Sequence, residues 1–414
     1  MFDDSRLFGT AFTEPVRDPI WRNILLPPSF LPVIEAPEFV QLSRILQLGP
    51  AHLVYPGATH TRRAHSIGVY EMARRQLSAL ASTGCLDGMD QASARAFLLA
   101  ALCHDLGHFP YAHSLKELPL AEHEALTARI VTGSLSPFIR GAGADPELVA
   151  AIVDQDLPAP SADAPWLGLF RRLLSGVLDP DKLDYLNRDA WACGVPYGLQ
   201  DVDFVLQHIG MGDDGRPGVD GRGVMAVEAV LFSKYQMYKA VYWHRGVRAA
   251  TAMIKKAVVS ALASGDLEPD ALYGLDDAGF YALMEGRDRL GMIAAVKSGA
   301  LMRCCLELPY EEALPAHAAA ASLDSRADVE TAITDALPAD ERGRSVIVDL
   351  PEPISFESDL PVLGSGGSFS ESATVFRPEV VSSFTRSLRV LRVYTDGQPD
   401  RVALAARSIL GPEA

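Results

Sequence analysis

The 414-residue sequence lacks the features that mark several common classes of protein. It has five cysteines, an odd number without a CxxC pair, so neither a disulfide framework nor a cysteine zinc site is expected. No run approaches the roughly 18 uninterrupted apolar residues of a transmembrane helix, and the acidic first residues do not resemble a signal peptide. We therefore expect a cytoplasmic protein with no membrane partner.

Basic residues are also scarce relative to acidic ones. The sequence has 37 Lys and Arg against 53 Asp and Glu, and its formal net charge is −16 at pH 7. A chain this acidic repels the phosphates of DNA and RNA, so nucleic acid is not expected as a main partner. Any site for a phosphate-bearing ligand must then be a local basic pocket.

Apolar residues are abundant, and their spacing is mostly helical. The hydrophobic fraction of 48% is enough to bury a large core. A short hairpin or loop is expected at 211–223. The periodicity predicts helices at 35–48, 65–81, 90–103, 121–134, 147–155, 165–176, 180–191 and 201–209, and one long helix or two in tandem at 226–263.

The end of the chain has a different character. Strands are predicted at 345–350 and 388–394, separated by a Gly/Ser-rich loop at 364–372, and a closing helix at 402–410. The predicted fold is therefore mainly α. A large all-helical domain would occupy residues 1–310, with its catalytic core at about 35–265, and a small α+β subdomain would occupy residues 311–414.

Histidines cluster in one part of the sequence. Of the ten, seven fall within residues 52–123, and histidine is both the commonest metal ligand and the usual acid–base group at neutral pH. A lone buried histidine is usually a satisfied core residue, but here His104-Asp105 ends the apolar helix predicted at 90–103. Polar side chains carried into the interior are costly unless they are bonded. A divalent cation would satisfy His65, His104, Asp105 and Asp181 together, and these nitrogen and oxygen donors suit Mn, Fe, Zn or Mg.

The order His65, His104-Asp105, Asp181 resembles the H…HD…D signature of the HD-domain metal-dependent phosphohydrolases. The flanking segments YPGATHTR at 55–62, CHDLGH at 103–108 and DPDKLDY at 179–185 resemble those of the deoxynucleoside triphosphate triphosphohydrolases. That family includes the dGTPases and the SAM-and-HD-domain dNTPases. The resemblance implies a helical HD-domain core and a divalent metal (Mg, Mn, Fe, Zn or Co). It also implies a homo-oligomer, dimer or tetramer, and cleavage of dNTPs into the deoxynucleoside and inorganic triphosphate.

The resemblance implies roles for individual residues as well. His113 and His123 would be the acid–base pair that protonates the leaving 5′-oxygen, Glu124 would orient His113 and hold it charged, and His108 would line the phosphate site. The implied metal ligands are His65, His104, Asp105 and Asp181. The implied substrate-binding residues are Gln47, Arg62, Lys182, Tyr185, Asp189, Lys234, Tyr242 and Trp243.

These substrate-binding residues would divide the nucleotide between them. Phosphates would be held by Arg62, Lys182, Tyr185 and Lys234, and the sugar 3′-hydroxyl by Gln47 and Asp189. Tyr242 would lie against the sugar 2′ position, where an added hydroxyl would clash. Trp243 would either contact the base or pack in the core, and both tyrosines could also be core aromatics with satisfied hydroxyls.

The sequence departs from the family pattern at two places. Lys116 stands where relatives carry an acid that supports the catalytic histidine, although Glu117 adjoins it, so either His113 or His123 could carry the proton. At the positions of a GTP-activator site stand Glu14, Val40, Ser43 and Asp396, which offer no cation to a triphosphate. We therefore expect dNTP hydrolysis without a GTP activator.

Two other functions stay open at this point. One is an HD-type phosphatase or phosphodiesterase that acts on nucleotides or nucleic-acid ends, and it would release a monophosphate rather than inorganic triphosphate. The other is a catalytically silent nucleotide-binding regulator. The presence of all four implied ligands and both acid–base histidines speaks against the silent regulator.

Overall fold

The structure is a computed structural model that describes residues 15–160, 164–365, 367–372 and 374–411. Most of these residues are helical, which confirms the mainly α fold with a small α+β region. The strands are β1 (Val16–Asp18), β2 (Arg22–Ile24), β3 (Ile209–Met211), β4 (Pro217–Val219), β5 (Arg303–Pro309), β6 (Val346–Asp349), β7 (Pro361–Val362), β8 (Gly367–Ser368) and β9 (Val390–Thr395). The helices are α2 (Leu31–Ile34), α3 (Pro37–Gln41), α4 (Arg62–Ser82), α5 (Gln91–Cys103), α6 (His123–Thr132), α7 (Ser136–Gly141), α8 (Pro146–Val153), α9 (Leu167–Leu174), α10 (Pro180–Cys193), α11 (Val202–Gln207), α12 (Val224–Met237), α13 (Arg245–Ala263), α14 (Asp277–Met284), α15 (Met292–Lys297), α16 (Pro315–Ala320), α17 (Leu323–Asp335), α18 (Pro378–Leu388) and α19 (Pro399–Leu410).

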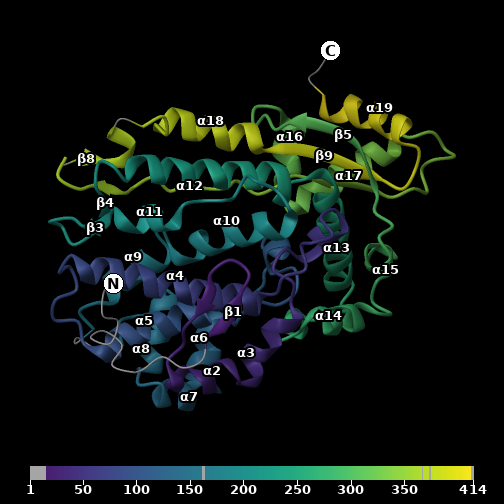
Figure 1. Ribbon diagram of the computed structural model, residues 1–414. Helices are drawn as coiled ribbons and strands as arrows, with labels where there is room; N and C mark the ends of the chain where they lie inside the picture. The colour runs from purple at the N-terminus through teal and green to yellow at the C-terminus, as the bar shows by residue number, and fades with distance from the viewer. Residues whose placement is uncertain (1–14, 161–163, 366, 373, 412–414) are drawn as a thin grey trace.

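Helix α4 is central to the helical part, since it packs against both α5 and α10 (Figure 1). Side-chain caps set where these three helices begin. Thr61 accepts a hydrogen bond from the backbone of Ala64, and Asp90 and Asp179 cap α5 and α10 in the same way. Helix α5 is buried nearly all round over its last residues, as its continuous apolar sequence predicts. Its buried position carries the following His104 and Asp105 into the interior.

The helix predicted at 35–48 is wrong in its extent. Helix α3 ends at Gln41, a short 3₁₀ turn follows, and the chain is extended at Ile45. The cause is pairing with the segment before α4, because the Arg62 backbone N–H donates to the Ile45 carbonyl and Leu46 forms a β-bridge with Thr61. Tertiary hydrogen bonds here override the local helical periodicity.

Other expectations for the helical part are met. The 211–223 segment belongs to a β-hairpin, β3 with β4. The segment 226–263 forms two tandem helices, α12 and α13, separated by a π-helical turn at Tyr238–Tyr242. Such turns interrupt the regular hydrogen-bond ladder and occur frequently at functional sites.

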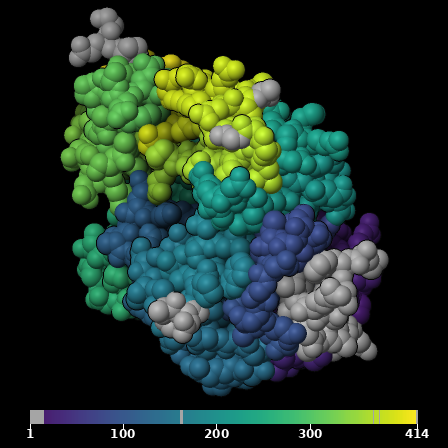
Figure 2. All heavy atoms as spheres, turned by 90° about the vertical axis from the view of Figure 1, so that its left-hand side faces the viewer, coloured from purple at the N-terminus to yellow at the C-terminus, as the bar shows by residue number. Residues whose placement is uncertain are grey.

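The C-terminal part contains an antiparallel sheet with strand order β5-β9-β6. Strands β6 and β9 and helix α19 agree with the predicted strands and closing helix, whereas β5 and α16 to α18 were not predicted. Strand β5 lies before residue 310, so the sheet draws on both units of the predicted division. In Figure 2 the green and yellow atoms of this part lie above the blue atoms of the first half of the chain.

Residues between β6 and β9 return to the helical part. Phe356, Phe369 and Phe376 are buried in the main hydrophobic core, and β7 joins β4 of the hairpin. The Gly/Ser-rich segment at 364–372 contains β8 and a 3₁₀ turn, while its residue 366 lies outside the described residues. Over the described part of the chain, no helix has both the length and the apolar character needed to cross a bilayer.

Candidate active site

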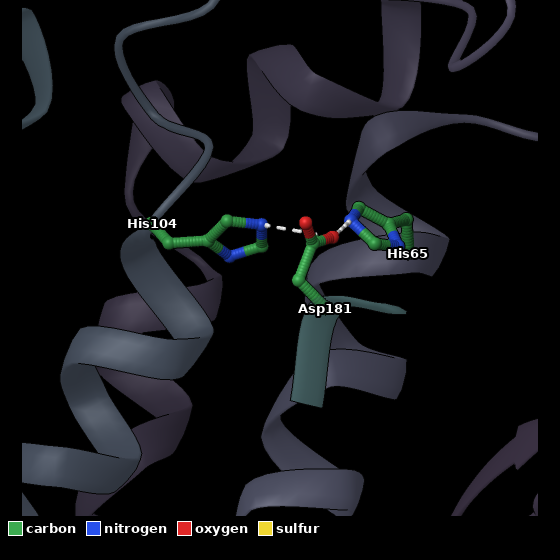
Figure 3. A group of neighbouring side chains, drawn as sticks. All are labelled: His65, His104 and Asp181. Carbon is green, nitrogen blue, oxygen red and sulfur yellow. Dashed lines mark ion pairs between the residues drawn. The ribbon is translucent and has the colours of Figure 1, made fainter. Parts of the chain in front are cut away.

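Four polar side chains meet between α4, the end of α5 and the start of α10. His65 Nε2 lies 3.0 Å from Asp181 Oδ1 and 4.0 Å from Asp105 Oδ2. His104 Nε2 lies 3.3 Å from Asp105 Oδ1 and 3.8 Å from Asp181 Oδ1. Figure 3 shows the Asp181 carboxylate between the two imidazole rings. The structure thus brings together all four residues that the sequence suggested as metal ligands.

The donor atoms of this group fit a divalent cation. His104 Nε2 is buried and has no hydrogen-bond partner among the described residues. His65, His104 and Asp181 each offer one ligand atom, and these atoms lie within 4.8 Å of one another. Two imidazole nitrogens with two carboxylates form a mixed donor set that suits first-row divalent metals or Mg. These four residues could therefore hold a metal.

A buried carboxylate behind His65 fixes the orientation of its ring. Asp184 Oδ2 lies 2.8 Å from His65 Nδ1, so Nε2 is left to face the ligand group. Asp184 is fully buried and also accepts hydrogen bonds from Trp21 Nε1 at 2.5 Å and from two nitrogens of Arg188 at 2.8 Å. Asp184 was not predicted as a site residue. The signal was present in its position three residues after Asp181 on the same helix.

Glycine at position 68 makes room for this arrangement. A Cβ atom at Gly68, one turn after His65, would lie 2.0 Å from Asp184 Oδ1 and 2.3 Å from Arg188 Nη2.

Hydrogen bonds to Asp181 and Asp184 also change the pKa of His65. Burial alone would lower the pKa of His65, but these hydrogen bonds raise it to about 10. A metal that binds at Nε2 must therefore displace a proton.

Arg62 holds the other carboxylate of the group. Its Nη1 donates to Asp105 Oδ2 at 2.7 Å, and both side chains are buried. Burial opposes the charged form of Asp105, yet the nearby charge of Arg62 holds the pKa of that carboxyl well below its usual range. Arg62 is thus placed at the ligand group, and its buried Nε has no partner among the described residues.

Three further histidines form a second group beside Asp105. The ring centroids of His108 and His123 are 3.8 Å apart, those of His108 and His113 are 4.6 Å apart, and His108 Nε2 is 3.2 Å from Asp105 Oδ1. Burial lowers the pKa of His108 and of His113 to about 3, and the charge of Arg62 adds to the effect. Burial beside His108 lowers the pKa of His123 to about 2. All three rings are therefore neutral near pH 7.

The predicted partner of Glu124 is wrong. Glu124 Oε2 lies 3.0 Å from Nδ1 of His123, the adjacent residue at the start of α6, rather than beside His113. The lowered pKa of His113 also contradicts the expectation that it is held charged. Glu117 does not replace it, because its carboxylate binds Lys255 and Arg326, the latter at 2.7 Å.

The residues assigned to the sugar also meet. The hydroxyl of Tyr242 donates to Asp189 Oδ2 at 2.6 Å, and the rings of Tyr185 and Tyr242 lie edge to face with centroids 6.4 Å apart. His60 Nε2 lies 2.8 Å from Asp189 Oδ1, while the backbone N–H of Gln47 donates to the His60 carbonyl. The side-chain Oε1 of Gln47 is buried without a partner among the described residues.

Trp243 follows this group but is buried in the core. It is 7% exposed, and its ring packs edge-on against Tyr238 with centroids 5.2 Å apart. Of the two roles left open by the sequence, this position favours core packing over contact with a base.

The two lysines assigned to phosphates are bound by the protein itself. Lys182 Nζ lies 2.6 Å from Asp179 Oδ2 and 2.9 Å from Glu357 Oε2. Lys234 Nζ donates to the carbonyl of Ser355 at 2.7 Å. Neither Glu357 nor Ser355 was predicted, since both lie far from the lysines in sequence.

The positions compared with a GTP-activator site have local partners. The Ser43 hydroxyl donates to the Val40 carbonyl at 2.6 Å, and Asp396 Oδ1 accepts from the Ser345 backbone at 2.8 Å. Glu14 lies outside the described residues. None of these contacts supplies a cation.

Comparison with protein families gives two matches that together cover most of the chain. The HD domain matches residues 62–165, which contain His65, His104 and Asp105. The HD associated region matches residues 201–411, half of the chain.

Several curated proteins are similar over part of their length. An uncharacterized protein of Methanocaldococcus jannaschii is 31% identical over 266 residues, which are 63% of this chain and 53% of that protein. An uncharacterized protein of Bacillus subtilis is 31% identical over 66% of this chain and 60% of its own length. The human deoxynucleoside triphosphate triphosphohydrolase SAMHD1 is 28% identical over 46% of this chain and 35% of its own length. The chain thus spans less than two thirds of these relatives.

Solved structures share the fold over nearly the whole chain. A hypothetical protein from Aquifex aeolicus superposes with a TM-score of 0.73 at 24% identity and covers 97% of this chain and 100% of its own. A phosphohydrolase from Bacteroides thetaiotaomicron gives a TM-score of 0.71 at 20% identity, over 94% of this chain and 100% of its own. At these identities the likeness establishes the fold alone.

Proposed function

Because the chain belongs to the HD-domain phosphohydrolase family, we propose that it hydrolyses deoxynucleoside triphosphates to the deoxynucleoside and inorganic triphosphate. The observation that carries the proposal is the order of groups along α10. Asp181 faces the ligand group, Tyr185 lies one turn later, and Asp189 lies two turns later with Tyr242 bonded to it. One face of α10 would thus present, one turn after another, a residue for the metal, a residue for the phosphates and a residue for the sugar.

The similarity to a named dNTP triphosphohydrolase supports this choice of substrate. Tyr242 donates a 2.6 Å hydrogen bond to Asp189, and the Tyr185 ring lies edge to face against the Tyr242 ring. A sugar bound at Asp189 would meet the ring of Tyr242, which leaves no partner for an added 2′-hydroxyl. We propose that this wall selects deoxynucleotides.

The metal site would be formed by His65, His104, Asp105 and Asp181. A divalent cation held there would polarise an α-phosphate oxygen and lower the pKa of a bound water. Arg62 would add positive charge at the same place while it fixes the Asp105 carboxylate through its 2.7 Å hydrogen bond.

The proton for the leaving 5′-oxygen would come from the group of His108, His113 and His123. These rings are neutral in the protein alone, because burial lowers the pKa of each. A triphosphate with about four negative charges would favour the protonated form of nearby imidazoles. Substrate binding would therefore charge one ring, and that ring would deliver its proton when the P–O bond breaks.

We also propose that no GTP activator is required. Val40, Ser43 and Asp396 offer a triphosphate no cation, and the carboxylate of Asp396 would repel it.

Product analysis tests the proposal directly. Purified protein is incubated with each dNTP, and with ATP, in the presence of Mg, Mn or Co, and the products are separated by chromatography. We expect deoxynucleoside and inorganic triphosphate from dNTPs, much slower cleavage of ATP, and no dependence on added GTP. His104→Ala is the matched control, since it removes one proposed ligand and should abolish both bound metal and turnover.

Other products would decide between functions. Release of monophosphate would favour an HD-type phosphatase or phosphodiesterase. Binding of dNTPs without any product, at full metal occupancy, would favour a nucleotide-binding regulator. An absolute need for GTP would contradict the proposed independence from an activator.

A further inference from the structure

The segment between β6 and β7 passes over the two lysines of the proposed phosphate site. Residues 350–360 are in neither helix nor strand. Their side chains alternate, as in any extended chain: Ile354 and Phe356 pack into the main core, while Ser355 and Glu357 are exposed. Residues 354–357 are called the strap below.

The strap supplies partners to both lysines. Glu357 Oε2 lies 2.9 Å from Lys182 Nζ, and the Ser355 carbonyl accepts from Lys234 Nζ at 2.7 Å. The Lys234 ammonium also lies 5.5 Å from the centroid of the Phe356 ring. Lys182 and Lys234 are only 8% and 7% exposed, and a buried ammonium without acceptors is costly. The strap therefore stabilises two cations that would otherwise lack part of their hydrogen bonding.

The two carboxylates on Lys182 differ in how firmly they are held. Asp179 is buried and also caps α10 by accepting from the backbone of Lys182, so its place is set by the helix. The Glu357 side chain is 43% exposed and can turn into solvent. Lys182 thus has one fixed carboxylate partner, Asp179, and one that a ligand can replace, Glu357.

We propose that the strap occupies the phosphate-binding lysines in the absence of substrate, with the Glu357 carboxylate in the place of a phosphate group. The inference rests on the proposed function, which assigns Lys182 and Lys234 to phosphates. A polyphosphate displaces Glu357 because several negative charges on one ligand can bind both lysines, whereas the strap offers one carboxylate and one carbonyl. Apparent affinity is lowered by the fraction of molecules in which the strap is closed.

Inorganic tripolyphosphate has no nucleoside, so its affinity reports the effect of the strap on phosphate binding alone. Binding of inorganic tripolyphosphate is measured by calorimetry for the wild type, Glu357→Gln and Glu352→Gln. Glu352→Gln is the matched control, as it makes the same change in the same segment at a residue that contacts no cation among the described residues. Because the displaced ion pair is partly exposed, we expect Glu357→Gln to bind roughly two- to fivefold more tightly, with Glu352→Gln unchanged. Equal or weaker binding by Glu357→Gln would overturn the proposal.

Movement of the strap needs its own measurement. Phe356→Trp places an indole in the buried anchor position, and its emission should shift to longer wavelength as tripolyphosphate is added. Binding without any shift would show that the strap stays in place, and would also overturn the proposal. Neither measurement uses turnover. If no dNTP is hydrolysed, the proposed function fails, while binding and fluorescence still decide the role of the strap.

Discussion

His65 and the neighbouring group of His108, His113 and His123 are all buried, yet their pKa values move in opposite directions. Hydrogen bonds to Asp181 and Asp184 raise the pKa of His65 to about 10 against the effect of burial. Burial lowers the pKa of His108 and His113 to about 3. Burial is common to all of them, so the difference lies in the carboxylates. His65 has two of its own, whereas the others adjoin Asp105, which Arg62 already holds.

The difference separates a group built to hold a cation from a group built to accept a proton. Around His65, carboxylates are fixed before any ligand arrives, which favours a metal with its positive charge. Around His108 and His113, the charged form of imidazole has no carboxylate of its own among the described residues and becomes favourable only when an anion enters. Single substitutions can therefore disturb metal binding at His65 and proton uptake by the other histidines separately.

The largest effect is expected from removal of the carboxylate behind His65. Asp184→Ala leaves Arg188, Trp21 and His65 without their shared acceptor in a fully buried position. We expect the free energy of unfolding to fall by about 3–5 kcal/mol, because the buried Arg188 loses one of its two carboxylate partners and keeps only Asp18. Metal affinity should fall by about 10–100-fold, since the orientation of the His65 ring is lost. Urea unfolding and elemental analysis measure the two effects.

Asp400→Ala is the control for this variant, because Asp400 is an exposed aspartate on α19, remote in sequence from the site. It should change neither stability nor metal content appreciably. Wild-type metal affinity in Asp184→Ala would show that His65 does not need its carboxylate partner.

The second effect is a change in the pH dependence of stability. Burial lowers the pKa of His123 to about 2, while an unfolded histidine titrates near 6.5. The unfolded state therefore binds one more proton between these values, and the stability contributed by His123 is present above about pH 6.5 and lost as pH falls. His123→Gln should reduce the slope of unfolding free energy against pH, between pH 5 and 6, by about 1.4 kcal/mol per unit.

The measurement uses metal-free protein and urea titrations at several pH values in that window. The raised pKa of His65 predicts the opposite dependence, since its contribution is present below about pH 6.5 and lost as pH rises toward 10. His65→Gln should therefore leave the acid slope unchanged. An unchanged acid slope in His123→Gln would mean that His123 is protonated in the folded protein.

Much of this site could be anticipated from local sequence. Thr61, Asp90 and Asp179 mark the starts of three helices by a rule that needs only neighbouring residues. The continuous apolar run of α5 predicts that His104 and Asp105 are carried into the interior. The meeting of these residues with His65 and Asp181 follows from the resemblance of the spacing to a known family.

What failed depends on contacts between distant segments. The helix predicted at 35–48 gives way because Leu46 pairs with Thr61. The partners of Lys182 and Lys234 come from residues 355 and 357, more than a hundred positions later, and no periodicity connects them. The partner of Glu124 depends on ring orientation at the start of α6, which sequence spacing does not determine.

The smallest expected effect concerns this last contact. Glu124 Oε2 lies 3.0 Å from His123 Nδ1, but its side chain is 42% exposed, so the interaction is worth about 1 kcal/mol or less. In the otherwise wild-type protein, we expect Glu124→Gln to lower kcat/KM for dATP by roughly two- to fivefold. Glu147→Gln, which makes the same change at an exposed glutamate at the start of α8, should have no effect. A double-mutant cycle then identifies the partner. In a His123→Gln background, Glu124→Gln should cause no further loss, whereas in a His113→Gln background its full effect should remain. The reverse pattern would restore His113 as the residue that Glu124 supports, in agreement with the family resemblance and against the geometry at the start of α6.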